Sequence, residues 1–395
     1  MPKIVRLGDV VLNLETGGRP KGGSVSKGVP SIGAEHLNNS GGFDFGNLRY
    51  VPTDYYRDLK KGKVTQEDIL IVKDGATTGK VSFVRSDFPF KEAAINEHVF
   101  KITVDREHAL PQYVFYYLYS PMGQNEILKD FRGATVGGIT RRLLDLTTIP
   151  MPRIEVQRRV AGVLDKAQEL IDKRKRQIEM LDEFLQSVFL DMFGDPVINP
   201  KGWRKQAIGE LTRVETGSTP RRDRNDYYLG GRIPWVKTGE IRGLPIRQVE
   251  EYITERAILE TNCKVFPKDT ILVAMYGQGQ TRGRAGIMKI SGATNQACAA
   301  ILPSPAINVD FLFKQLCFRY QEIRELGRGG NQANLNLGMV RSLEVIIPPV
   351  HLQEEFSGIV KRATTQQRLM RHSLSLMQSN LNSIMQRAFK GKLFS

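Results

Sequence analysis

The strongest constraint on the fold is an internal repeat at a spacing of 196 residues. Adding 196 to a position between about 130 and 193 returns the same residue many times, without a change of register. The matching pairs include Pro152 with Pro348, Gln157 with Gln353, Leu185 with Leu381 and Phe193 with Phe389. Upstream, the segment LGDVVLNLETGGRP from Leu7 is similar to IGELTRVETGSTP from Ile208. The chain therefore consists of two copies of one unit, each a mixed segment followed by a tail of about 40 residues.

The tails carry a heptad pattern of apolar residues. In the first tail, two series of positions seven residues apart begin at Val160 and Leu164, and nine of their ten members are apolar. The equivalent series of the second tail begin at Phe356 and Val360 and are also apolar at nine of ten positions. A proline precedes each tail, and Gly194 follows the first. This pattern predicts two long amphipathic helices.

The two helices are expected to pack on each other, because neither can bury its apolar stripe alone. The polar members of the series are Arg174 and Gln367, and an antiparallel register that brings them together matches apolar positions elsewhere. The pairs in this register are Val160 with Leu381, Ala167 with Leu374, Leu181 with Val360 and Leu185 with Phe356. The sequence therefore predicts an antiparallel intramolecular coiled coil in which one polar layer fixes the register.

The two mixed segments have the patterns of strands, turns and one helix each. Short β-branched runs such as ILIVK at 69–73, KVSFVR at 80–85 and TILVAMY at 270–276 are typical of strands. Residues 111–131 and 309–326 have helical spacing, and their aromatic side chains are expected in the core rather than free to stack on bases. These aromatic residues are Tyr113, Phe115, Tyr116, Phe311 and Phe318. The predicted fold class is α+β, with two mixed α/β domains at 1–152 and 195–349 separated by an antiparallel two-helix coiled coil of 153–194 and 350–395.

The charge of the chain indicates an acidic partner. Lys and Arg number 57 against 42 Asp and Glu, giving a net charge of +15. Such an excess in a chain of ordinary globular composition favours nucleic acid or an anionic membrane as the partner. Residues 1–152 hold 20 basic and 17 acidic side chains, residues 195–350 hold 22 and 15, and residues 153–194 hold eight of each. Most of the excess therefore lies in the two mixed domains.

Several classes of protein do not fit the sequence. No apolar stretch approaches the roughly 18 residues of a membrane span, and the first residues lack the apolar core of a signal peptide. Three cysteines without a CxxC spacing predict a cytoplasmic protein without disulfides. The five histidines are scattered, so we expect no metal site. From the lack of a membrane-spanning stretch we expect no membrane partner.

The basic residues of the mixed domains lie beside glycines and beside hydroxyl or amide side chains. This mixture suits duplex DNA, because Lys and Arg neutralise phosphates while Arg, Gln and Asn can bond to base edges. The predicted DNA-binding residues of the first domain are Arg19, Lys21, Lys27, Lys73, Thr77, Thr78, Lys80, Arg132 and Arg141. Those of the second domain are Arg221, Arg222, Arg224, Lys237, Gln278, Gln280, Arg282, Arg284, Arg328, Asn331 and Gln332.

Candidate enzyme motifs fail on their spacing. The segment GATTGKV from Gly75 has three residues before Gly79 where a phosphate-binding loop needs four, and Val81 stands where that loop has Ser or Thr. We interpret it as a turn. The segment IIPPV around Pro348 lacks the Asn or Asp and the aromatic residue of an amino-methyltransferase motif. The sequence therefore offers no catalytic constellation and predicts no catalytic residue.

The order of these motifs, present twice, resembles the specificity subunit of type I restriction-modification systems. The resemblance covers the whole chain and is carried by ETGSTPRRDRNDYYLGGRIPWVKTGEI, its echo ETGGRPKGG, GATTGKVSF, TRGRAGI, ATNQ, and the helix starts IPMP and IIPPVHLQEEF. The first copy departs most from the pattern: it lacks the Trp and the Tyr-Tyr block. It also has Ile95-Asn96-Glu97 where the second copy has Thr294-Asn295-Gln296.

The resemblance implies a non-catalytic subunit that binds no cofactor itself. Its implied partners are double-stranded DNA, two adenine methyltransferase subunits that use S-adenosylmethionine, and restriction or translocase subunits that use ATP and Mg²⁺. Each mixed domain would read one half of an asymmetric, bipartite site, and the paired helices, about 60 Å long at 1.5 Å per residue, would act as a ruler. The alternatives are a stand-alone DNA-modifying enzyme and a coiled-coil scaffold that does not bind DNA.

Overall fold

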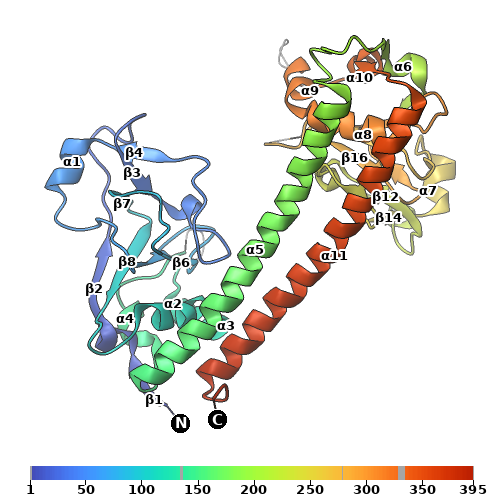
Figure 1. Ribbon diagram of the computed structural model, residues 1–395. Coiled ribbons are helices and arrows are strands. Elements are labelled where there is room, and N and C mark those ends of the chain that lie inside the picture. Colours follow the sequence, from blue (N-terminus) through green and yellow to red (C-terminus); the bar gives the residue numbers. More distant parts are fainter. Residues whose placement is uncertain (1, 134–136, 278, 328–333, 395) are drawn as a thin grey trace. The chain divides into compact units, whose positions relative to one another are not determined.

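The computed structural model describes residues 2–133, 137–277, 279–327 and 334–394 (Figure 1). The chain divides into two compact units. Unit 1 comprises Met1–Arg176 and Arg371–Ser395, and unit 2 comprises Gln177–Met370. Two helices of 40 residues, α5 (Ile154–Phe193) and α11 (Val350–Phe389), each contribute to both units. Neither unit therefore corresponds to a single predicted domain, because each unit also includes part of both long helices.

Unit 1 contains two small sheets and a strand pair. The first sheet has the order β2 (Val11–Thr16), β8 (Val99–Val104), β5 (Ile69–Val72), β6 (Val81–Phe83), with antiparallel neighbours. The second has the order β4 (Arg49–Val51), β3 (Val29–Ile32), β7 (Ala94–Ile95), and β3 runs parallel to β7. Strand β1 (Lys3–Arg6) pairs with β9 (Thr148–Met151). The helices are α1 (Thr53–Asp58), α2 (Pro111–Tyr119), α3 (Pro121–Ile127) and α4 (Leu143–Leu146).

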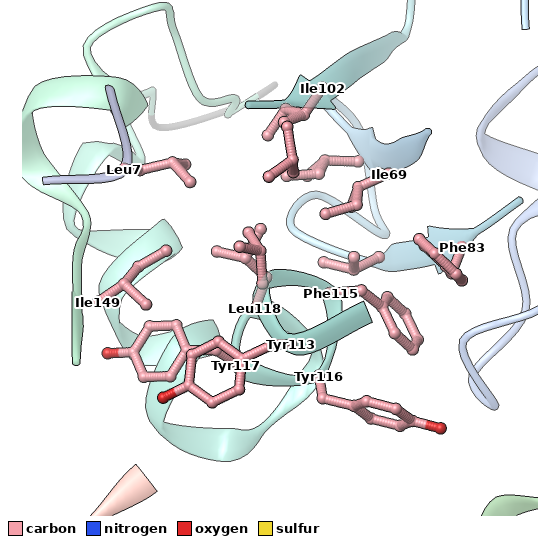
Figure 2. Close-up of a cluster of buried hydrophobic side chains, with 14 of the residues drawn as sticks. Leu7, Ile69, Phe83, Ile102, Tyr113, Phe115, Tyr116, Tyr117, Leu118 and Ile149 are labelled. Carbon is pink, nitrogen blue, oxygen red and sulfur yellow. The ribbon is translucent and has the colours of Figure 1, made fainter. Parts of the chain in front are cut away.

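The core of unit 1 lies between the first sheet and α2 (Figure 2). Ile69, Phe83 and Ile102 face Phe115 and other side chains of α2. Tyr113, Phe115 and Tyr116 of α2 are buried, as the sequence predicts. The single helix predicted over 111–131 is wrong in one respect, since it is two helices. Pro121 has no N–H to continue α2, and the Ser120 hydroxyl caps α3 by accepting the Gly123 N–H at 3.2 Å.

Unit 2 repeats the same elements in the same order. Its larger sheet has the order β11 (Val214–Thr216), β18 (Cys298–Ile301), β15 (Ile271–Ala274), β16 (Ala285–Met288), β13 (Pro245–Ile246). The smaller sheet has the order β14 (Tyr252–Ile253), β12 (Ile233–Val236), β17 (Ala293–Thr294), and β10 (Lys205–Ala207) pairs with β19 (Glu344–Ile346). The helices are α6 (Ile208–Leu211), α7 (Glu255–Glu260), α8 (Val309–Phe318), α9 (Tyr320–Leu326) and α10 (Leu337–Ser342). Apart from the added strand β13, the topology confirms the internal repeat.

The long helices pack on each other in an antiparallel sense, as predicted. In unit 1, the first part of α5 shares a core with the last part of α11, and in unit 2 the end of α5 shares a core with the start of α11. The shared core residues are Val160, Leu164 and Ile171 with Leu381, Met385, Ala388 and Phe389 in unit 1, and Leu185, Phe189 and Phe193 with Phe356, Val360 and Ala363 in unit 2. The α+β fold with a two-helix coiled coil is therefore confirmed.

The predicted polar layer is wrong for Gln367. Its amide Nε2 donates to Asp182 Oδ1 at 2.8 Å, eight positions beyond Arg174 along α5. The ring of Phe356 packs against Phe189 and Phe193, with centroids 5.4 and 5.6 Å away. A heptad pattern determines which face of a helix is buried, but a shift along the axis by one or two turns still matches apolar to apolar. The phenylalanine rings select the shifted register because together they fill the space between the helices.

One repeated glutamine at the start of each long helix attaches that helix to the rest of its unit. Gln157 is buried, its Oε1 accepts the Leu110 N–H at 2.8 Å, and its Nε2 donates to the Pro152 carbonyl at 2.9 Å. Gln353 is buried in the same way, with its Oε1 on the Asn308 N–H at 2.9 Å and its Nε2 on the Pro348 carbonyl at 2.7 Å. Each amide thus joins the start of a long helix to the start of α2 or α8.

Changing Gln157 to alanine is expected to destabilise unit 1 by about 1–3 kcal/mol, because the partly buried Leu110 N–H and Pro152 carbonyl both lose their partner. Denaturant unfolding followed by circular dichroism measures the loss. The control is Gln186→Ala, since Gln186 lies exposed on the same helix. Equal effects of the two changes would contradict this role of the Gln157 amide.

Candidate nucleic-acid interface

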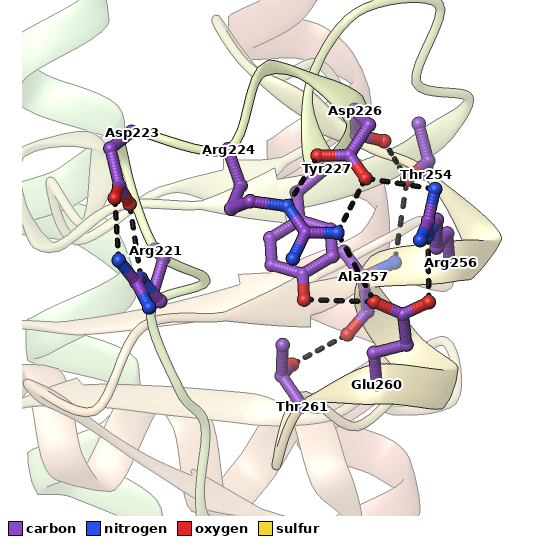
Figure 3. Close-up of polar contacts among 10 residues, drawn as sticks. All are labelled: Arg221, Asp223, Arg224, Asp226, Tyr227, Thr254, Arg256, Ala257, Glu260 and Thr261. Carbon is purple, nitrogen blue, oxygen red and sulfur yellow. Dashed lines mark hydrogen bonds and ion pairs between the residues drawn. The ribbon is translucent and has the colours of Figure 1, made fainter.

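Arg221 and Arg224, from one loop of unit 2, lie near Arg256 of α7 (Figure 3). Arg221 forms two hydrogen bonds to Asp223, with Nε–Oδ1 at 3.1 Å and Nη2–Oδ2 at 2.6 Å. Arg224 binds Asp226 in the same two-bond manner, at 2.8 and 2.7 Å. Arg256, from α7, contacts Asp226 at 3.0 Å and extends the ion-pair network to a second carboxylate, that of Glu260, at 2.7 Å. These contacts hold the loop against α7.

Arg222 points to a different set of partners. Its guanidinium lies 4.8 Å from the ring centroids of both Tyr228 and Trp235, and it pairs with the Glu251 carboxylate. Lys237 contacts the same Glu251 at 3.5 Å and Glu250 at 3.1 Å. The two rings lie against the guanidinium, its Nη1 and Nη2 both bond to the Glu251 carboxylate, and the Arg222 side chain is 52% exposed.

The sequence predicts Arg221, Arg222, Arg224 and Lys237 as DNA-binding residues, and the structure pairs each of them with a carboxylate. We define the arginine cluster by its ten charged side chains, which are Arg221, Arg222, Arg224, Lys237, Arg256, Asp223, Asp226, Glu250, Glu251 and Glu260. Five are cationic and five anionic, so the cluster is close to neutral as a whole. Its arginines are ordered in advance, but a phosphate would have to compete with carboxylates for them.

Hydrogen bonds from the arginines lower the pKa values of the carboxyl groups in the arginine cluster. Arg224 lowers the pKa of Asp226 to about 2, Arg256 lowers the pKa of Glu260, and Arg222 lowers that of Glu251. A depressed folded-state pKa adds stability above the unfolded carboxyl value of about 4, and this is lost as the pH falls toward 2. Asp226, Glu251 and Glu260 therefore stay charged at neutral pH.

The glycine-rich segment of unit 1 is a turn, as the failed phosphate-loop spacing predicts. Gly75 and Gly79 have φ angles of +94° and +87°, and the Thr78 hydroxyl donates to the Gly75 carbonyl at 2.7 Å. Strand β6 then begins at Val81, where a phosphate loop would begin a helix. Thr77, Thr78 and Lys80 line a cavity of about 430 Å³ with residues of α2 and α3, and Lys73 pairs with Asp74 at 3.3 Å.

The structure places the other predicted residues in separate loops. Lys21 and Lys27 are exposed before β3, and Arg132 and Arg141 are exposed before α4. In unit 2, Arg284 Nη2 donates to Gln280 Oε1 at 2.7 Å, and Arg282 lies in the same turn. The predicted residues Gln278, Arg328, Asn331 and Gln332 lie outside the described residues. Among the described residues, some members of the predicted set come together in the arginine cluster and others in a turn of unit 1 and a turn of unit 2.

A polar cavity of about 670 Å³ in unit 1 contains residues that the sequence prediction missed. Arg19 is the one predicted residue in its lining. The missed residues are Glu35, Asn47, Arg49, Asn96, Glu97 and His98. The sequence prediction includes no acidic side chain and no histidine, and it leaves out Arg49 of β4 although GGFDFG at 41–46 lies just before it. The echo of ATNQ at Ala94–Glu97 was the available signal for Asn96 and Glu97.

Comparison with known proteins identifies the family of this repeated fold. The family model of the type I restriction modification DNA specificity domain matches the chain twice, at residues 3–180 and 200–376. The chain belongs to this family. Each match contains one mixed α/β domain and most of one long helix, and this confirms the resemblance seen in the sequence. Membership of the specificity-domain family supports a role in DNA sequence specificity.

Relatives within the specificity-domain family are distant in sequence. The specificity subunit of type I restriction enzyme MjaIX from Methanocaldococcus jannaschii is 26% identical over 283 residues, which are 66% of this chain and 64% of that protein. The match thus spans less than two thirds of that relative. The StySPI specificity subunit of Salmonella potsdam is 21% identical over 391 residues, covering 92% of this chain and 82% of that protein.

A solved structure shares the fold. The crystal structure of a type I restriction-modification system S subunit from M. genitalium has a TM-score of 0.53 and 16% identity, and the superposition covers 98% of this chain and 96% of that one.

Among the described residues of the present specificity-domain protein, no helix combines the length and apolar character needed to cross a membrane. In the same part of the chain, His, Cys, Asp and Glu side chains do not gather in groups of three or more suited to a metal ion.

Proposed function

We propose that the chain is the DNA-binding specificity subunit of a type I restriction-modification complex and that it has no catalytic activity of its own. The observation that carries this proposal is the double match to a DNA specificity domain within one chain. Each unit would bind one half of a bipartite site through its loops. Since the two copies differ in the residues of these loops, the site would be asymmetric.

The residues proposed to bind DNA are those predicted from the sequence, together with Arg49, Asn96 and Glu97 of the polar cavity. Arg222 has the strongest claim in unit 2, because two rings lie 4.8 Å from its guanidinium and its side chain is 52% exposed. The implied partners are two adenine methyltransferase subunits, which would bind S-adenosylmethionine, and restriction or translocase subunits, which would use ATP and Mg²⁺. The exposed faces of α5 and α11 would bind these subunits.

Sequencing of methylated bases in the source genome, with and without this gene, tests the proposal. We expect the loss of one bipartite methyladenine motif when the gene is deleted. An unchanged set of methylated motifs would contradict the proposal. Methylation or cleavage of DNA by the purified chain alone would instead support a stand-alone enzyme, and binding that ignores salt would support a scaffold without DNA recognition.

Lengthening both long helices is expected to lengthen the spacer between the half-sites. Seven residues inserted between Arg176 and Gln177, and seven between Met370 and Arg371, add about 10 Å of helix, or about three base pairs. The methylated motif should keep both half-sites and gain this spacing. As a control, the same seven residues are inserted after Ile198, which lies in the loop after α5 and is 76% exposed. This insertion lengthens neither long helix. A change in the half-site sequences would contradict the proposal that the paired helices set only the spacing between the half-sites.

Neutralising Glu251 is expected to strengthen DNA binding. Glu251→Gln releases Arg222 and Lys237 from their shared carboxylate, so one more phosphate contact becomes available. The slope of log K against log salt concentration should steepen by about one, as measured by fluorescence anisotropy with a duplex. Glu210→Gln, an exposed change of equal charge on α6, serves as the control. An unaltered slope for Glu251→Gln would exclude Arg222 and Lys237 from the phosphate contacts.

A further inference from the structure

The two units present one loop in the same backbone frame. In unit 1, β7 lies parallel to β3, and the Asn96 N–H continues the pairing to the Ile32 carbonyl at 3.0 Å. In unit 2, β17 lies parallel to β12, and the Asn295 N–H bonds to the Val236 carbonyl at 3.3 Å. Each asparagine side chain then accepts the N–H two residues later, at 3.0 Å from His98 and 3.2 Å from Ala297. The backbone after the asparagine therefore has the same course in both units.

A glycine locks a second loop against this frame in each unit. A Cβ on Gly17 would lie 1.8 Å from the Ile95 carbonyl oxygen, and a Cβ on Gly217 would lie 1.8 Å from the Thr294 carbonyl oxygen. Only glycine permits this approach, because a carbon atom cannot come so close to backbone. The loops after β2 and β11 are thereby held in the same place beside the loops after β7 and β17.

Within this shared frame, one pair of side chains differs in its chemistry between the two units. In unit 1, Arg19 Nη1 forms an ion pair with Glu97 Oε1 at 3.8 Å. In unit 2, the equivalent positions are Thr219 and Gln296, and the threonine hydroxyl donates to Gln296 Oε1 at 2.5 Å. The alignment of ETGGRP with ETGSTP, and of AINE with ATNQ, sets this correspondence. A charged pair has thus been replaced by a neutral pair while the backbone around it is unchanged.

Both pairs are open to a ligand. The Arg19 and Glu97 side chains are 66% and 34% exposed, and both line the polar cavity of unit 1. Gln296 is exposed in unit 2. The ion pair in unit 1 is long and therefore weak, so each of its members retains hydrogen-bonding capacity for another partner.

We propose that these two pairs determine one base pair in each half-site: Arg19 and Glu97 read a G·C pair, and Thr219 and Gln296 read an A·T pair. This inference rests on the proposed function. Arginine donates two bonds to guanine O6 and N7, and a glutamate accepts from the amino group of the paired cytosine. Glutamine forms two bonds with adenine N6 and N7, and threonine can contact thymine through its hydroxyl or methyl group. The exchange of one pair for the other therefore exchanges the base pair that fits.

Exchanging the pairs tests the proposal in the source strain, with methylated motifs read by sequencing. The double variant Arg19→Thr/Glu97→Gln is expected to change one position of one half-site from G·C to A·T and to leave the other half-site intact. The reciprocal variant Thr219→Arg/Gln296→Glu should change one position of the other half-site from A·T to G·C. At each position the preference in Kd should move by about 10- to 100-fold. Glu107→Gln, which removes one exposed carboxylate of unit 1 as Glu97→Gln does, should leave the motif unchanged.

A second measurement uses the unaltered protein and remains informative if a variant does not fold. The complex purified from the source strain is titrated with duplexes in which each guanine of the first half-site is replaced in turn by 7-deazaguanine, which lacks N7. We expect binding to weaken about 10-fold at one guanine. Variants that keep the original motif, or no weakening at any guanine, would overturn this inference alone. The absence of any motif that depends on the wild-type gene would overturn the proposed function.

Discussion

Replacing Phe356 with alanine is expected to lower the free energy of unfolding of unit 2 by about 3–5 kcal/mol. The Phe356 ring is fully buried and packs against Phe189, Phe193 and Phe311. These rings come from α5, α8 and α11, so one side chain joins both long helices to the body of the unit. A cavity at this position removes contacts from all three helices at once, and relaxation of the surrounding rings recovers only part of the loss.

Denaturant unfolding of the variant, followed by near-ultraviolet circular dichroism, measures this loss. Phe184→Ala is the matched control, because Phe184 lies on α5 within the same unit and is 50% exposed. The control should lose less than about 1 kcal/mol. A loss for Phe356→Ala no greater than that for Phe184→Ala would show that the aromatic cluster does not hold the helices in unit 2.

Replacing Gly217 with alanine is expected to destabilise unit 2 by about 3 kcal/mol, at the upper end of the cost of overpacking. The new methyl group would lie 1.8 Å from the Thr294 carbonyl oxygen, and backbone cannot move aside as a flexible side chain can. The loop after β11 must therefore separate from β17. Because Thr219 and Gln296 lie on these two segments, recognition of one half-site should weaken by about 100-fold in Kd while the other half-site is still recognised.

The separate responses of the two half-sites make this prediction specific. Binding to duplexes that carry one half-site at a time distinguishes a local rearrangement from a general loss of fold. Gly239→Ala is the control, since a Cβ on Gly239 would meet no atom within 4 Å. Equal weakening at both half-sites would contradict the assignment of one half-site to each unit.

The repeat made the organisation into two copies of one unit predictable from the sequence, and the structure supplies the reason for some of the repeated identities. Gln157 and Gln353 recur because each satisfies two backbone groups at the start of a long helix. The heptad pattern also predicted the buried face of each helix. It could not predict the axial offset, because that depends on how the rings of Phe189, Phe193 and Phe356 fill space, and several offsets preserve the apolar pattern.

The candidate site was less predictable than the fold. Counting charges along the sequence identified Arg221, Arg222 and Arg224 correctly as neighbours, but it could not show that carboxylates distant in sequence, such as Glu251 and Glu260, come to lie against them. The same counting passed over Glu97, because an acidic side chain opposes phosphates even though it suits a cytosine amino group. Residues that read bases are thus harder to find from composition than residues that bind phosphates.

The composition of unit 1 bears on how the protein is made by the ribosome. Phe389, near the end of α11, packs on Tyr113 and Tyr117 with ring centroids 5.4 and 5.1 Å apart, and Leu381 and Met385 belong to the same core. The segment 1–176 of unit 1 therefore acquires the last side chains of this core only after unit 2, Gln177–Met370, has been synthesised. During translation its apolar surface stays uncovered throughout the synthesis of unit 2, so the order of completion is the reverse of the order of synthesis.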